Sequence, residues 1–139
     1  MTNLKNEKYE KIRQVFREYR ILKKELEYRT KYIEDFRKIL IRPLPKNEEV
    51  LHKIYKTIIG DMENTANKMA LRLRLIENTI NRLYGSEKTV MYYRYIEGID
   101  WLKMPEYMMY EQRTCQLFEA NAIKKIYRMN IDWENENAK

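Results

Sequence analysis

The chain has few of the residues that interrupt helices or build reactive sites. Its 139 residues include three glycines, three prolines, one cysteine and one histidine. So few glycines and prolines, together with 35% charged residues, favour helices joined by few turns, and we predict an all-α fold. A lone cysteine excludes an internal disulfide, so Cys115 is expected to be a buried structural thiol in a reducing compartment.

Patterns typical of catalysis or metal binding are also missing. His52 has no cysteine or second histidine at metal-ligand spacing, so a structural or solvent role is expected for it. There is no glycine-rich phosphate loop, and neighbouring carboxylates such as Glu34 and Asp35 point in different directions on a helix. We therefore predict no enzymatic activity, no cofactor and no metal.

Long apolar runs are absent as well. No segment approaches the ~20 apolar residues that cross a bilayer. Lys5, Glu7 and Lys8 interrupt the positions where a secretory signal would begin. These features predict a cytoplasmic protein that does not contact membranes. The formal net charge of +7 favours an acidic partner such as nucleic acid.

Apolar residues recur every seven positions near the start of the chain. The series comprises Ile12, Tyr19, Leu26, Ile33 and Leu40. A second apolar series lies three positions after the first and comprises Val15, Leu22 and Phe36. Arg29 occupies the one position of this second series that is not apolar. This pattern predicts a long helix over residues 12–40 with a narrow seam for another helix. Proline 43 and proline 45 would end it.

A second long helix is predicted over residues 47–84, with Asn47 as its N-cap. Its apolar stripe consists of Leu51, Ile54, Ile58, Met62, Ala66, Met69, Leu73, Ile76, Ile80 and Leu83. The simplest packing pairs it antiparallel with the first helix. Residues 1–84 are therefore expected to form a coiled-coil-like helical hairpin that also serves oligomerisation.

Residues 85–129 have a different layout. Gly85 is expected to end the long helix and Ser86 to cap the next one. Residues 101–108, after an Asp100 N-cap, predict a short helix, although Pro105 also allows a start near residue 103. Met109 stands in the turn where a left-handed residue is common.

A further helix begins near residue 112, and its apolar face comprises Cys115, Phe118, Ala122, Ile123 and Ile126. Two helices joined by a tight turn can place the second one in the DNA major groove. We therefore predict a helix-turn-helix DNA-binding domain over residues 85–129, followed by a polar tail over residues 130–139.

These residues resemble region 4 of bacterial sigma factors and the sigma-like regulators of phages. The resemblance begins at Tyr95-Ile96-Glu97-Gly98 and continues through Cys115, Glu119-Ala120, Ala122-Ile123 and Lys124-Lys125-Ile126. The order of the modules also resembles phage late transcriptional regulators of the RinA and ArpU type. The resemblance implies a sequence-specific, DNA-binding transcriptional regulator, encoded by a phage or prophage, with RNA polymerase as a further expected partner.

Combined with this resemblance, the chemistry of the helix beginning near residue 112 predicts its contacts with double-stranded DNA. Arginine and glutamine side chains can bond bidentately to guanine and adenine, so base reading is assigned to Gln112, Arg113 and Gln116. Contacts with the DNA backbone are assigned to Thr114, Lys124, Lys125 and Arg128. Residues 85–129 carry seven basic and six acidic side chains, so tight binding is expected to need a homodimer or higher homo-oligomer.

Two other functions fit the same sequence. A small terminase-type DNA-packaging component also combines a helix-turn-helix with oligomerising helices, but generally carries the DNA-binding module first and assembles into large rings. A protein-only helical adaptor or inhibitor acting on RNA polymerase is the other alternative. The nearly neutral charge of residues 85–129 is the feature that favours it.

Overall fold

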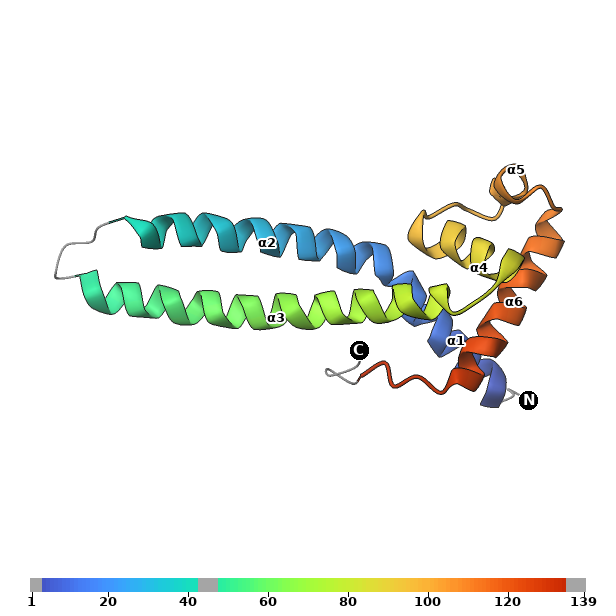
Figure 1. The fold of residues 1–139 in the computed structure, drawn as a ribbon, viewed down its shortest axis with the longest axis horizontal. Helices are drawn as coiled ribbons and strands as arrows, with labels where there is room; N and C mark the ends of the chain where they lie inside the picture. Colours follow the sequence, from blue (N-terminus) through green and yellow to red (C-terminus); the bar gives the residue numbers. More distant parts are fainter. Residues whose placement is uncertain (1–3, 43–47, 135–139) are drawn as a thin grey trace.

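The computed structural model describes residues 4–42 and 48–134. Every regular element in these ranges is a helix, which confirms the all-α fold. Two long helices lie side by side as an antiparallel hairpin, and the other helices gather at one end of it (Figure 1). The expected Asn47 cap and the turn at prolines 43 and 45 lie outside the described residues.

The helix predicted over residues 12–40 is bent at Glu18. The helix α1 spans Leu4–Arg17 and α2 spans Tyr19–Ile41. Glu18 keeps a nearly helical φ of −74° and ψ of −16°, and its N–H donates to the carbonyl of Gln14 at 3.3 Å. Phe16 and Tyr19, on either side of the bend, are fully buried. The bend therefore leads α1 away from the hairpin and into the group of shorter helices (Figure 1).

The hairpin consists of α2 and α3, which spans Glu49–Asn81. Its own seam is thin, with Ile33, Ile59 and Ala66 as the buried apolar residues of that cluster. The predicted apolar stripe of α3 is wrong at its first three positions, because Leu51, Ile54 and Ile58 are exposed and Ile59 is buried in their place. Near the tip of the hairpin, α2 is the one helix in the described ranges that packs against α3. A single neighbouring helix covers a narrow strip of α3, so the remaining apolar side chains there stay exposed.

The other end of the hairpin carries a head, which we define as α1, α4, η2, α5 and α6. Their ranges are Gly85–Met91 for α4, Tyr92–Ile96 for the π-helix η2, Met104–Met108 for α5 and Gln112–Met129 for α6. The main core joins α1 and the adjacent ends of α2 and α3 to these helices. Its fully buried members include Phe16, Tyr19, Ile76, Ile80, Val90, Met91, Met104, Cys115, Ile123 and Ile126. The domain boundary expected after residue 84 therefore runs through a shared core.

Two glycines shape the turns on either side of α4 and η2. Gly85 has φ of +56° and Gly98 has φ of +75°, a conformation that side chains disfavour. A Cβ on Gly98 would also collide with the guanidinium of Arg20. Ser86 is not the cap that its sequence position predicts, because the N-cap of α4 is Tyr84 and no side chain caps this helix.

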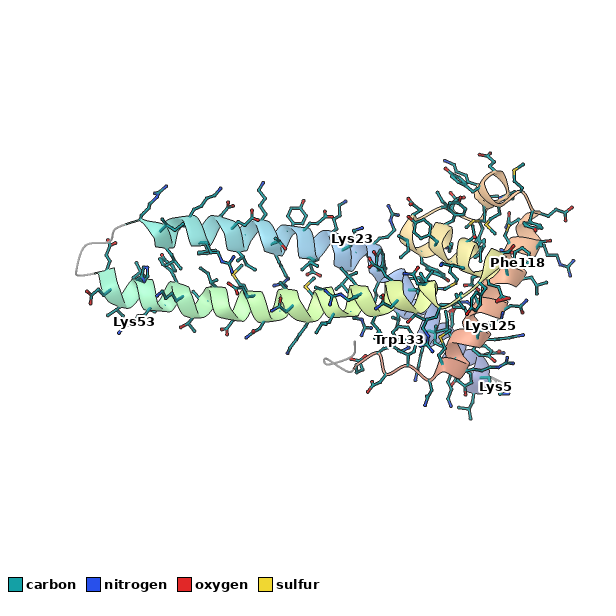
Figure 2. The ribbon with its side chains drawn as sticks, viewed as in Figure 1. Lys5, Lys23, Lys53, Phe118, Lys125 and Trp133 are labelled. Atoms are coloured by element: carbon teal, nitrogen blue, oxygen red, sulfur yellow. The ribbon has the colours of Figure 1, made fainter. Side chains whose placement is uncertain are left out.

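The segment after α6 packs back onto the head. The ring of Trp133 lies edge-on to Phe16, with centroids 5.6 Å apart, and its carbonyl accepts a hydrogen bond of 2.8 Å from Arg72 (Figure 2). The start of the predicted polar tail is thus part of the packed structure. In the two described ranges, no helix combines the length and apolar content needed to cross a membrane.

Candidate functional site

A short helix, a left-handed turn and the start of a longer helix lie on the side of the head away from the hairpin (Figure 1). The start near residue 103 is confirmed: α5 begins at Met104, and Pro105 occupies its tolerant first turn. Asp100 caps the preceding turn, where its Oδ1 accepts from the N–H of Lys103 at 3.1 Å. Met109 ends α5 with φ of 63° and ψ of 29°, so it adopts the left-handed conformation itself.

The buried face of α6 follows the sequence prediction closely. Cys115, Ala122, Ile123 and Ile126 are buried, as predicted. Phe118 is only partly buried and packs edge-on against Tyr110, with ring centroids 5.0 Å apart. This face fixes the rotation of α6 about its axis, and so decides which residues point outward.

Glu119 is a buried charged residue that the sequence analysis did not single out as structural. It is 4% exposed, and its carboxylate accepts from Arg13 Nε at 3.0 Å and Nη2 at 3.0 Å. The hydroxyl of Tyr95 donates to the same carboxylate at 2.6 Å. Burial and the Glu119 charge raise the pKa of Tyr95, and the hydrogen bond to Glu119 raises the pKa of Arg13. This network fastens α6 to both α1 and η2.

The outward side of α6 carries a face that we call the basic face. It consists of Arg113, Leu117, Lys124 and Arg128, all exposed. Their spacing of four, seven and four residues places them on one side of the helix, opposite Cys115, Glu119 and Ile126. None of its three cations forms an ion pair within the described part of the chain. Leu117 was not among the contact residues predicted from the sequence, although the helical periodicity alone places it opposite the apolar stripe.

The other predicted contact residues lie off this face. Gln112 and Thr114 are half-buried at the start of α6. Gln116 is exposed at the edge nearest α1. Lys125 pairs with Glu87 of α4, so its charge is already compensated within the head (Figure 2). The structure thus brings Arg113, Lys124 and Arg128 together and separates the remaining four from them.

A hollow of about 310 Å³ adjoins Gln116 and contains several cations. Arg13 and Arg17 reach it from α1, and Arg94 reaches it from η2. The Arg94 guanidinium stacks on Trp101 at 5.2 Å from the ring centroid and donates to the carbonyl of Ile99 at 3.2 Å. The carboxylates of Glu10 and Glu119 line the same hollow and pair with Arg17 and Arg13, so Arg94 is its one arginine without an ion pair in the described ranges.

The two residues considered for thiol or metal chemistry have structural contacts. Cys115 is buried, its Sγ lies 3.7 Å from the Tyr110 carbonyl, and burial raises its thiol pKa. His52 Nε2 lies 3.3 Å from the carbonyl of Leu40, across the hairpin. Within residues 4–42 and 48–134, no three histidine, cysteine or acidic side chains are grouped to hold a metal ion.

The site is therefore a short helix, a left-handed turn and a helix whose outward face is basic and whose inward face is locked into the core. Comparison of the chain with models of known protein families, with curated proteins and with solved structures finds no match in any of the three.

Proposed function

We propose that the chain binds duplex DNA in a sequence-specific manner and regulates transcription, with α5, the Met109 turn and α6 acting as a helix-turn-helix. The observation that supports this most is the basic face of α6. It points away from the core, while Glu119 and its partners hold the opposite side of the same helix in place. A rigid helix with uncompensated cations on its outer side is suited to the DNA major groove.

The position of each residue suggests its contact. Arg113 lies in the first turn of α6, where residues of a recognition helix meet base edges, and arginine bonds bidentately to guanine. Leu117, one turn later, offers an apolar surface for a thymine methyl group. Lys124 and Arg128 lie farther along and contact phosphates. Gln116 reads a base at the edge of the groove.

The resemblance of residues 95–128 to sigma factor region 4 supports the remaining parts of the proposal. These are a phage or prophage origin, promoter DNA as the target and a contact with RNA polymerase. The terminase-type alternative is less favoured, because the helix-turn-helix follows the long helices instead of preceding them.

A protein-only adaptor acting on RNA polymerase is the second candidate. The observation that favours it is the exposure of apolar side chains in the turns before and after α5, namely Leu102, Met109 and Tyr110. Such side chains bind protein surfaces more readily than they bind DNA phosphates.

Selection from a random duplex pool, followed by anisotropy titration at matched salt, tests the proposal. Arg113→Ala is expected to relax sequence preference at one or two base pairs. Lys124→Ala and Arg128→Ala are expected to weaken binding to all sequences, each lowering the salt slope by about 1. Lys125→Ala should have a smaller effect, because this lysine is paired with Glu87.

The matched control is Lys53→Ala, which removes an exposed lysine at the far end of the hairpin (Figure 2). It should leave the affinity of a single head for DNA unchanged. If no duplex is retained even at low salt, DNA binding is excluded and the adaptor is favoured. If duplexes are retained but the four α6 variants bind like the parent chain, another face makes the contact.

A further inference from the structure

The helix α2 carries a line of apolar side chains that its own chain does not cover. Ile21, Tyr28, Tyr32 and Ile39 are 71%, 69%, 62% and 43% exposed. At ~100° per residue, they lie within about 40° of one another around the helix. The seam that packs on α3, which includes Ile33, lies roughly 110° away. We call these four residues the outer line of α2.

The outer line has the same residue order and spacing in both directions. Its members follow one another at steps of seven, four and seven residues, as Ile, Tyr, Tyr and Ile. A two-fold axis perpendicular to α2, at the level of Thr30, would bring Ile21 opposite Ile39 of a second copy and Tyr28 opposite Tyr32. A two-fold interface needs a surface complementary to itself, and a palindromic line of side chains meets that requirement.

The flanking charges agree with the same register. Lys24 and Asp35 lie on one side of the outer line, and a two-fold axis at residue 30 brings each close to the other residue of the second copy. Both side chains are exposed, and neither forms an ion pair in the described ranges. Two such pairs would form by symmetry, one at each end of the contact.

A surface hollow adjoins the outer line where α2 meets the head. Ile21 borders a surface hollow of about 450 Å³ that is also lined by Lys23 and by Ile96 of η2. Ile39 of the second copy would arrive at the level of Ile21, beside this hollow. The contact can therefore extend to the base of the head.

We propose that the outer line is the dimer interface of this protein and that its occupant is the α2 helix of a second copy, running antiparallel. The dimer adds a second layer to a hairpin whose own seam buries little, and it covers four large apolar side chains from each copy. The two heads then lie at opposite ends of the assembly. This interface is independent of whether the heads bind DNA.

Disulfide trapping in the full-length chain tests the direction of the contact. A mixture of Ile21→Cys chains and Ile39→Cys chains should yield a cross-linked dimer on mild oxidation. Either variant alone should not, because equivalent positions lie about 27 Å apart in the antiparallel register, beyond the reach of a disulfide. The native Cys115 is fully buried, and the unsubstituted chain is the control for its contribution. Cross-linking of Ile21→Cys with itself, as efficient as in the mixture, would overturn the proposal.

Sedimentation equilibrium tests the interface itself. The parent chain is expected to be a dimer, and Tyr28→Glu combined with Tyr32→Glu should raise the dissociation constant at least about tenfold by placing charges in an apolar contact. Thr30→Glu, on the exposed opposite side of α2, is the matched control and should remain a dimer. Circular dichroism should show the same helix content in all three. A monomeric parent chain, or a double variant that dimerises like the parent, would refute the interface.

Discussion

At the scale of single residues, Glu119 is the side chain on which the orientation of α6 most depends. It accepts hydrogen bonds from Arg13 and Tyr95, which belong to α1 and η2. Removing the carboxylate leaves a guanidinium without its partner and a hydroxyl unpaired in a buried position. Both losses cost free energy, because protein groups taken out of water need replacement partners.

Glu119→Ala is expected to lower the free energy of unfolding by about 2–4 kcal/mol. Glu25→Ala is the control, since the exposed Glu25 pairs with Arg29 along α2, outside this network, and should cost less than about 1 kcal/mol. Urea unfolding followed by circular dichroism measures both. Equal losses for the two variants would show that the network does not hold α6.

Cys115 predicts a pH dependence of stability. Burial raises its pKa in the folded chain, while the pKa of the thiol in the unfolded chain is about 8.5. Below that pH both states keep the proton and stability does not change. Above it the unfolded chain loses the proton first, so the free energy of unfolding falls as pH rises.

Comparison with Cys115→Ala isolates this effect. The stability advantage of the parent chain over the variant should be constant from pH 6 to pH 8 and should shrink between about pH 8.5 and pH 10. Thermal or urea unfolding of both chains across this range provides the measurement. An advantage that stays constant up to pH 10 would contradict the assignment.

At the scale of elements, the turn between α5 and α6 shows how backbone conformation sets the site. Met109 is 85% exposed, so its side chain contributes little packing, yet it adopts a positive φ. A non-glycine residue in this conformation is strained, and a β-branched residue is strained further. The turn tolerates the strain because the buried residues Met108 and Cys115 fix its two ends.

Met109→Gly should therefore raise the free energy of unfolding by up to about 1 kcal/mol, and Met109→Val should lower it by about 1–2 kcal/mol. Met109→Ala, which retains a Cβ without branching, should fall between them. Chemical denaturation of the three variants gives the comparison. The opposite order, with valine more stable than glycine, would exclude the left-handed turn.

The rotation of α6 about its axis could be predicted from the sequence, because its apolar residues recur at helical spacing. These residues, which are buried in the structure, are Cys115, Ala122, Ile123 and Ile126. The same periodicity indicates that Arg113 and Lys124 point outward. It does not reveal that Lys125 is held by Glu87, a residue 38 positions earlier in the chain. Pairing between elements depends on how they are placed in space, and spacing along one helix carries no information about that.

At the scale of the whole molecule, the proposed DNA binding by the head and the proposed dimer together predict the form of the target sequence. An antiparallel dimer places two heads about a two-fold axis, so a target read by both has inverted symmetry. Selection with the parent chain should return inverted repeats. The Tyr28→Glu and Tyr32→Glu double variant should return single half-sites with lower affinity. Inverted repeats selected equally by both chains would show that the heads do not pair through α2.

The sequence alone determined that the described chain is helical, that it turns near Gly85, and which side of α6 is apolar. These features follow from interactions within a few residues, so a local pattern is enough to predict them. Only the tertiary structure decided the bend at Glu18, the packing of α1 against α6 and the burial of Glu119. Arg13 and Glu119 are 106 positions apart, and a charge becomes stable inside the protein only when the fold brings its partners to it.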